Sequence, residues 1–213
     1  AGESQIPIGV TLGANGLSYC LAGSAKDSLI NIYGWTINDA GIGCPQVTIT
    51  SLAGEVGNIK QGSVNNLVYA FSIDADASAT LSDFDFSTSA GVSPAYISGD
   101  LDSMKLYVSD NATFDATAIL LTEFVSSGAA GENFNSSFSP VSITAGVTKY
   151  LFITTAVDAN ATVGNILKFG TPSFANFVFA QSVVDNASSI VGSESIHIAQ
   201  SGDPQPLGTK GIY

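Results

Sequence analysis

The chain has 213 residues, which is enough for one large all-β domain or two small ones with a hydrophobic core. Its formal net charge of −12, with no arginine, excludes nucleic acid and disfavours an anionic membrane surface as a partner, because clustered cations bind phosphate groups. Hydrophobic residues make up 45% of the chain. No run of about eighteen apolar residues occurs, so we expect no membrane insertion.

The chain starts on Ala1, without a charged and then apolar leader. We therefore expect an exported chain from which a secretory signal has been removed, and an extracellular or cell-surface location. In that compartment the two cysteines, Cys20 and Cys44, predict a disulfide.

The segment Gln5–Gly13 alternates strictly between large apolar residues and small, polar or proline residues. One face of an extended strand would therefore carry all four large side chains, which are Ile6, Ile8, Val10 and Leu12. Two interpretations remain open. The segment is either the first strand of its own domain or a donor strand that completes the sheet of a neighbouring copy.

Further strand patterns follow at short intervals and are separated by Gly, Ser, Asn and Asp clusters. They are Leu29–Ile37, Val47–Leu52, Leu67–Ile73, Thr80–Phe86, Met104–Val108, Ala118–Phe124, Val141–Ile143, Thr148–Thr155, Asn165–Phe169, Phe177–Val184 and Ser189–Ala199. No helical stripe of a dozen residues is present, although Asp110–Ala118 could hold one helical turn.

These patterns predict an all-β protein, an immunoglobulin-like or jelly-roll-type β-sandwich with an N-terminal extension strand. We expect residues 1–13 to form that donor-type strand and residues 14–199 to form the sandwich. Residues 200–213 contain two prolines and three glycines, which predict an extended tail.

The middle of the chain resembles a known module. Leu67–Ile73, Gly99–Val108 and Asn111–Phe114 carry the first half of the resemblance, and Ile143–Ile153 and Ala161–Ile166 carry the second. The pattern is similar to the non-catalytic β-sandwich module associated with BNR-repeat sialidases and bacterial surface proteins. The resemblance covers about residues 67–169. It implies a sandwich fold without catalytic residues, and the chain departs from that pattern in its cysteine-bearing N-terminal region.

A second resemblance concerns the overall plan. An alternating N-terminal strand ahead of an immunoglobulin-like sandwich is similar to the extracellular filament subunits that assemble by donor-strand complementation. This resemblance implies copies of the chain as partners in a head-to-tail polymer.

Catalytic equipment is sparse, and we predict that the chain is not an enzyme. The only histidine, His197, lies in a strand-like alternation, and no G-x-S-x-G motif accompanies it. Two carboxylates would suffice for a glycosidase, but few aromatic residues are expected outside strands to stack on sugars.

We predict no cofactor, with calcium as the one ion that the acids could bind. The pairs Asp74 with Asp76 and Asp100 with Asp102 each place two carboxylates on one strand face or loop. Asp is also an ordinary turn former beside strands, so a structural role is the alternative. Four sequons could carry glycans, at Asn111, Asn135, Asn160 and Asn186.

We therefore expect a structural subunit of an extracellular filament, pilus-like fibre or biofilm polymer, joined by strand exchange. The alternative is a secreted carbohydrate- or surface-binding sandwich, an adhesin without catalysis. That alternative predicts exposed aromatic side chains on loops, for which Tyr96 and Phe134 are the candidates.

Overall fold

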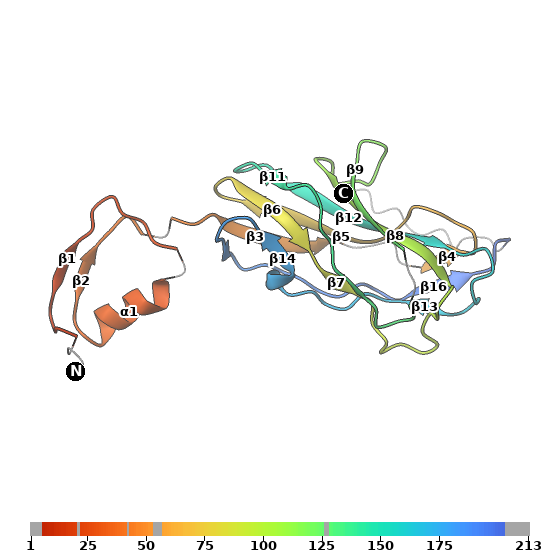
Figure 1. Ribbon diagram of the computed structural model, residues 1–213, viewed down its shortest axis with the longest axis horizontal. Coiled ribbons are helices and arrows are strands. Elements are labelled where there is room, and N and C mark those ends of the chain that lie inside the picture. The colour runs from red at the N-terminus through yellow and green to blue at the C-terminus, as the bar shows by residue number, and fades with distance from the viewer. Residues whose placement is uncertain (1–5, 21, 42, 53–56, 126–127, 203–213) are drawn as a thin grey trace.

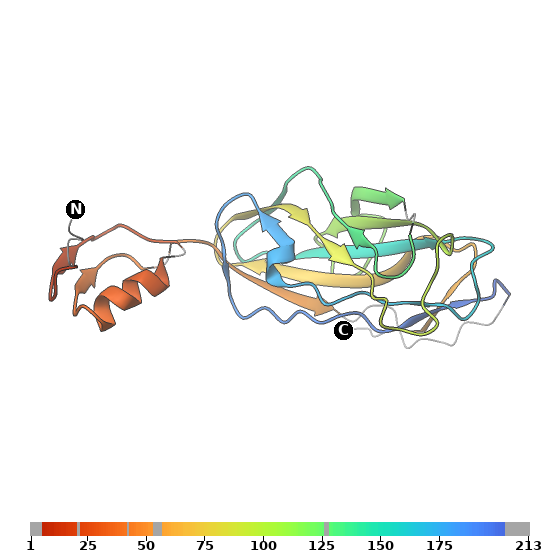
Figure 2. The ribbon, with the colours of Figure 1, turned by 60° about the horizontal axis from the view of Figure 1, so that its bottom comes forward.

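The computed structural model describes residues 6–20, 22–41, 43–52, 57–125 and 128–202. Figures 1 and 2 show a small N-terminal unit, residues 6–44, that projects from one end of a β-sandwich beginning at Pro45. The described residues between 14 and 44, which we predict from the sequence to belong to the sandwich, lie with the N-terminal strand instead. The boundary falls at Pro45 rather than after residue 13.

The N-terminal unit contains two strands and one helix. The strand β1 (Thr11–Gly13) pairs in parallel with β2 (Thr36–Asn38), and α1 (Gly23–Asn31) connects them. The helix is followed by an αL cap, because Gly34 has a φ of 64° and its N–H donates to Ile30 O. Trp35 N–H also donates to Leu29 O.

Two local expectations are wrong here. The predicted strand Leu29–Ile37 is the end of α1, a turn and the start of β2. The predicted continuous strand over Gln5–Gly13 begins outside the described residues. Within residues 6–13 only β1 forms, because Gly9 takes a φ of 69° and turns the chain before Thr11. The helix escapes detection because it has no side-chain N-cap bond and no buried residue, so its sequence carries little helical pattern.

The first layer of the sandwich is a six-stranded sheet. Its strands lie in the order β15 (Val184–Asp185), β3 (Gln46–Leu52), β5 (Asn66–Ala75), β12 (Lys149–Val157), β8 (Leu101–Ser109) and β9 (Ile119–Val125). The neighbours β3 to β9 are antiparallel, whereas β15 is parallel to β3.

The second layer consists of shorter sheets. One has the order β11 (Val141–Ile143), β6 (Ala79–Phe84) and β14 (Phe177–Phe179), and another pairs β10 (Asn133–Phe134) with β7 (Phe86–Ser87). The 3₁₀ turn η1 (Phe174–Asn176) precedes β14. A third sheet has the order β13 (Ile166–Leu167), β16 (Ile196–Ala199) and β4 (Gly57–Lys60).

The hydrophobic core fills the space between these layers. Phe71 of β5 makes edge contacts with Phe84 and Phe177, and the rings of Phe84 and Phe177 stack with centroids 4.3 Å apart. Aromatic pairs of this kind add to the free energy of burial. The all-β sandwich predicted from the sequence is confirmed.

The two long sides of the sandwich differ. On one side the chain from Val184 to Ser189 closes β3, where Asn186 N–H donates to Val47 O and Ser51 N–H donates to Ser189 O, both at 2.9 Å. On the other side β9 is the last strand of its sheet in the described part of the chain. No helix among the described residues is long and apolar enough to cross a membrane.

Candidate functional site

The N-terminal unit has almost no interior. Within its described residues, Cys44 alone is buried, whereas the sandwich buries a cluster of large side chains from both layers. Ile6, Ile8 and Leu12 are exposed, with 44%, 82% and 43% of their surface accessible. A unit of this kind gains little from hydrophobic burial and presents much apolar surface to a partner.

An apolar groove of about 240 Å³ separates the β1–β2 pair from α1. Leu12 and Ile37, which are cross-strand partners, line one wall, and Ala25 and Leu29 of α1 line the other. The groove shows that the helix covers the strand pair only loosely.

A polar cluster closes one end of this groove. Lys26 Nζ lies 2.9 Å from Asp39 Oδ1 and 4.8 Å from the centre of the Tyr19 ring. The hydrogen bond from Lys26 lowers the pKa of Asp39, and the same bond raises the pKa of Lys26. This pair links α1 to the end of β2.

The predicted disulfide between Cys20 and Cys44 is present, with a Cα–Cα distance of 5.2 Å. It encloses α1 and β2 and lies where the chain enters the sandwich. The N-terminal segment is also held by main-chain bonds, because Gly9 N–H donates to Tyr33 O and Thr36 N–H donates to Val10 O, both at 2.8 Å. Trp35 Nε1–H donates to Pro7 O at 2.7 Å.

The four predicted donor-strand residues therefore lie in the N-terminal unit, not against the sandwich of their own chain. Ile6 and Ile8 precede β1, Val10 is half-buried, and Leu12 faces the groove. The strand β1 pairs only with β2 among the described residues.

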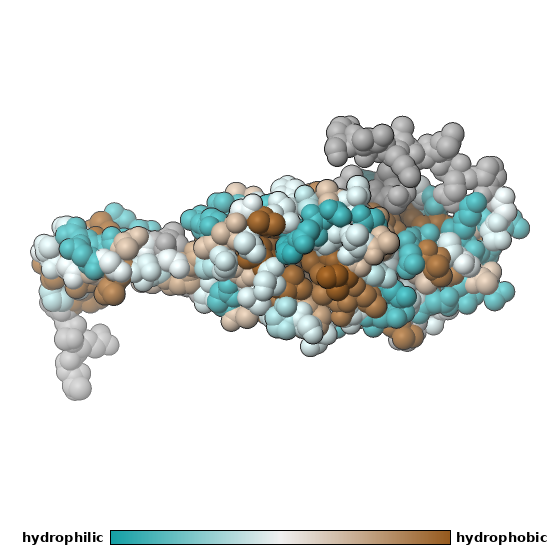
Figure 3. All heavy atoms as spheres, turned by 90° about the horizontal axis from the view of Figure 1, so that it is seen from above, coloured by the Kyte–Doolittle hydropathy of each residue, from teal (hydrophilic) through white to brown (hydrophobic). Residues whose placement is uncertain are grey.

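The open side of the sandwich carries a matching apolar strip, which we call the open seam. It lies between β9 in one layer and the β10–β11 stretch in the other. Four of its residues are partly buried against the core and one is exposed. The partly buried residues are Leu121, Phe124, Phe138 and Val141, and the exposed residue is Ile119. Figure 3 views the molecule from the side on which β9 and β11 lie in Figure 1, and apolar side chains gather there over the middle of the sandwich.

The edge strand itself is irregular. The register of β8 and β9 shifts between Leu106 and Tyr107, where Leu106 pairs with Thr122 and Tyr107 pairs with Leu120. Leu121 is thus an extra residue on β9, a β-bulge. Phe124 reaches the core and meets Phe86 and Phe134 edge-on. Ile119, at the other end of β9, is 66% exposed.

The four candidate calcium ligands do not come together. Ile73 pairs with Lys149 and Leu101 pairs with Val157, so Asp74 and Asp76 lie at the opposite end of the sheet from Asp100 and Asp102. Asp74 accepts a hydrogen bond from Thr148, and Asp76 accepts one from Gln46 N–H at 2.7 Å. Among the described residues, no three His, Cys, Asp or Glu side chains form a group that could hold a metal.

Asp100 has a structural role. Its buried carboxylate accepts hydrogen bonds from Ile97 N–H at 2.8 Å, Thr162 N–H at 2.7 Å and Asn165 Nδ2 at 2.8 Å. Burial would raise its pKa, but these hydrogen bonds outweigh that effect and hold the pKa below its ordinary value. Asp102 is exposed, but partial desolvation and the neighbouring Asp158 carboxylate raise the pKa of its side chain.

The remaining predicted residues lie apart from one another. The four sequon asparagines are all exposed, at Asn111, Asn135, Asn160 and Asn186. His197 is exposed on β16 and pairs with Ile166 and Asn58.

The expectation that Tyr96 and Phe134 are exposed loop aromatics is wrong. Both side chains are buried. The Tyr96 hydroxyl shares a hydrogen bond of 2.7 Å with Thr88 Oγ1, and Phe134 stacks on Phe86 with ring centroids 5.0 Å apart. Aromatic rings gain more by completing the core than by standing on a loop.

Sequence reasoning found the exposed N-terminal segment but missed the open seam. Its residues come from β9 and from the stretch that leads into β11, and only the crossing of the chain between the two layers places them together. No protein-family model and no curated protein sequence matches this chain, so we interpret these surfaces from their geometry and chemistry.

Proposed function

We propose that this chain is a structural subunit of an extracellular filament, in which the N-terminal segment of one copy adds to the open seam of the next. One observation carries the proposal. The molecule has an exposed apolar segment around Ile8 on the projecting unit, and on the sandwich an apolar strand, β9, whose outer edge pairs with no other strand among the described residues. Edge addition would satisfy the backbone groups of β9 and cover both apolar surfaces.

The position of the N-terminal unit favours exchange between copies. Figures 1 and 2 both show the unit projecting away from the sandwich, with a single chain crossing that leads into β3. The donor and acceptor surfaces are different parts of the molecule, so the contact is heterologous. A heterologous contact that does not close into a ring produces an open fibre.

The sequence of the donor segment is compatible with an edge position. Pro7 lacks an N–H and suits the outer strand of a sheet, and Ile6, Ile8 and Val10 would present every second side chain to the seam. Gly9, now at a φ of 69°, would have to become extended, a change that glycine makes at little steric cost. The disulfide supports assembly in an oxidising, extracellular environment.

The test uses full-length protein and two surface variants. Ile8→Ser removes an exposed donor side chain, and Ile119→Lys places a charge on the acceptor edge. Burying the exposed part of Ile8 is worth about 1–2.5 kcal/mol, so Ile8→Ser should weaken association roughly 5- to 70-fold. Sedimentation velocity over a concentration series and negative-stain electron microscopy measure the assembly.

The matched control is Val163→Lys, because Val163 is 52% exposed on a loop away from the seam. This variant should assemble like the unmodified protein. A labelled peptide of residues 4–13 should bind Ile8→Ser protein in a fluorescence-anisotropy titration and should not bind Ile119→Lys protein. Full-length protein that stays monomeric at every concentration and does not bind the peptide would show that strand addition does not occur.

A further inference from the structure

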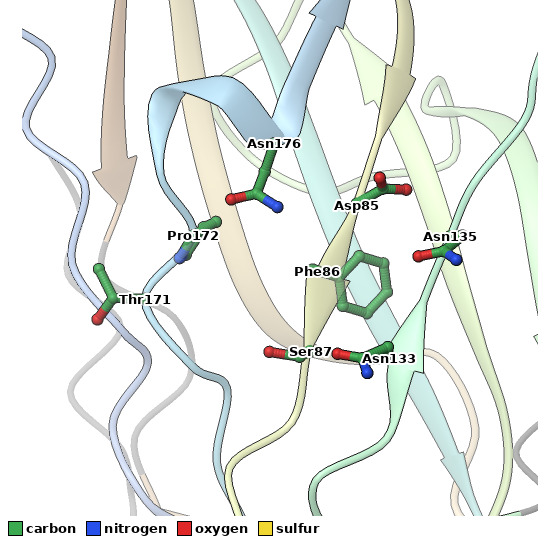
Figure 4. Close-up of a pocket in the computed structure, with 8 residues that line it drawn as sticks. All are labelled: Asp85, Phe86, Ser87, Asn133, Asn135, Thr171, Pro172 and Asn176. Atoms are coloured by element: carbon green, nitrogen blue, oxygen red, sulfur yellow. The ribbon is translucent and has the colours of Figure 1, made fainter.

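A small polar hollow lies on the outer face of the second layer (Figure 4). Two main-chain hydrogen bonds define its ends. Gly170 N–H donates to Ser87 O at 2.9 Å, and Asp85 N–H donates to Asn176 O at 3.0 Å. Between these two bonds the chain advances by two residues on one side, from Asp85 to Ser87, and by six residues on the other, from Gly170 to Asn176. The segment 171–175 therefore arches away from β7 and leaves a cavity of about 190 Å³.

The arch leaves main-chain groups directed into this cavity. In an antiparallel pair, the N–H and the C=O of one residue point to the same side of the strand. Asp85 N–H and Ser87 C=O point toward the arch, since each bonds to it. Asp85 C=O and Ser87 N–H therefore point the same way, into the space that the arch leaves.

Polar side chains surround these groups. Asn133 is the cross-strand partner of Ser87, and the two lie side by side in Figure 4, with Asp85 and Asn135 above them. Asn176 lies on the opposite wall with its amide nitrogen turned toward Asp85 in the same view.

The rest of the lining is fixed by the fold. Thr171 and Pro172 belong to the arch, and Phe86 lies below, with its ring stacked on Phe134 in the core. The Asn176 amide oxygen is fixed by Ser173, whose N–H and hydroxyl donate to it at 2.8 Å and 2.9 Å. The wall that carries Asn176 is therefore preorganised.

We propose that this hollow binds a single neutral sugar residue of a glycan. A sugar hydroxyl both donates and accepts hydrogen bonds, and amide side chains offer both functions, as do Asp85 C=O and Ser87 N–H. An anionic ligand would meet the Asp85 carboxylate with no cation in the lining. A calcium ion prefers several carboxylates, and this cavity has one. The site goes beyond self-association. Asn133 and Asn135 belong to the β10–β11 stretch, but none of the five residues of the open seam lines the cavity.

Saturation-transfer NMR with the methyl glycosides of glucose, galactose, mannose and N-acetylglucosamine tests the site. The full-length protein is produced in a host without N-glycosylation, so that Asn135 carries no sugar. At least one glycoside should receive saturation, with a dissociation constant in the millimolar range, since no exposed aromatic ring lines the cavity. The transfer should persist in the presence of EDTA.

Two variants assign any binding to the hollow. The double variant Asn133→Ala/Asn135→Ala and the single variant Asp85→Asn should each reduce the transfer at least about fivefold. The control Asn160→Ala removes an exposed asparagine from another loop and should leave the transfer unchanged. The proposal is overturned if no glycoside receives saturation, if the transfer survives in the double variant, or if EDTA abolishes it. None of these results bears on filament assembly, which sedimentation of the same samples reports separately.

Discussion

The N-terminal unit should depend on its disulfide far more than the sandwich does. The bridge joins residues 24 positions apart, and in the chain-entropy description such a loop closure is worth about 3 kcal/mol. Cys44 is the only buried residue among the described residues of the unit, so little hydrophobic burial replaces that contribution. The variant Cys20→Ser/Cys44→Ser should therefore shift the folding equilibrium of the N-terminal unit roughly 140-fold toward the unfolded form.

The only tryptophan reports on this change directly. Trp35 lies in the turn before β2 and donates its indole N–H to Pro7 O at 2.7 Å. We expect the serine variant to show a red-shifted Trp35 emission at room temperature, while far-UV circular dichroism and the main thermal transition of the sandwich change little. Reduction of the unmodified protein should give the same two signals.

Two outcomes would refute the reasoning. If Trp35 emission is unchanged in the serine variant, the unit has another source of stability. If the main thermal transition falls together with the emission change, the unit and the sandwich fold as one cooperative body. The control Ser18→Ala changes a neighbouring exposed side chain and leaves the bridge intact.

Three further predictions concern the sandwich. Asp100→Ala leaves three donors without their acceptor and should lower the free energy of unfolding by about 3 kcal/mol in urea titrations. Because the folded-state pKa of Asp100 lies below its ordinary value of 3.8, its ionised form adds stability that is lost as the pH falls through the folded-state pKa. Asp100→Asn should make the free energy of unfolding depend less steeply on pH in the acid range. An equally steep dependence in this variant would contradict the role given to the Asp100 carboxylate. Burial raises the pKa of Tyr96 from 10.0 to about 12. The stability that the neutral phenol contributes should therefore be full below pH 10 and decline as the pH rises toward 12. Tyr96→Phe should remove this part of the alkaline loss of stability. Phe84→Ala should lower the free energy of unfolding, measured by calorimetry, by about 3–5 kcal/mol. A loss below about 1 kcal/mol would mean that neighbouring side chains move into the space that the ring leaves.

The long strands of the sandwich could be predicted because each carries its own pattern. The predicted Leu67–Ile73 lies within β5, and the predicted Met104–Val108 lies within β8. A segment this rich in apolar and aromatic residues is recognisable as a strand from its own sequence, without knowledge of its partners in the sheet. The predicted Phe177–Val184 is shorter in the structure, because only Phe177–Phe179 pairs with β6 before the chain crosses to β3.

The parts that sequence could not predict are those in which burial is decided by distant partners. Tyr96 looks like a loop aromatic, and only its contact with Thr88 and the surrounding core reveals its place. The open seam has no sequence pattern of its own, because its residues follow from the order of strands in two layers. The polar hollow depends on the lengths of chain between Gly170 and Asn176, a property of the arch rather than of any motif.

The position of the disulfide also has a mechanical consequence. A tensile load applied at Thr11 would reach the sandwich through the covalent link from Cys20 to Cys44, which bypasses α1 and β2. The intervening loop would then bear none of the load and would add nothing to the length of a stretched subunit. The force would enter at the beginning of β3, which is held by its ladders to β5 on one side and β15 on the other.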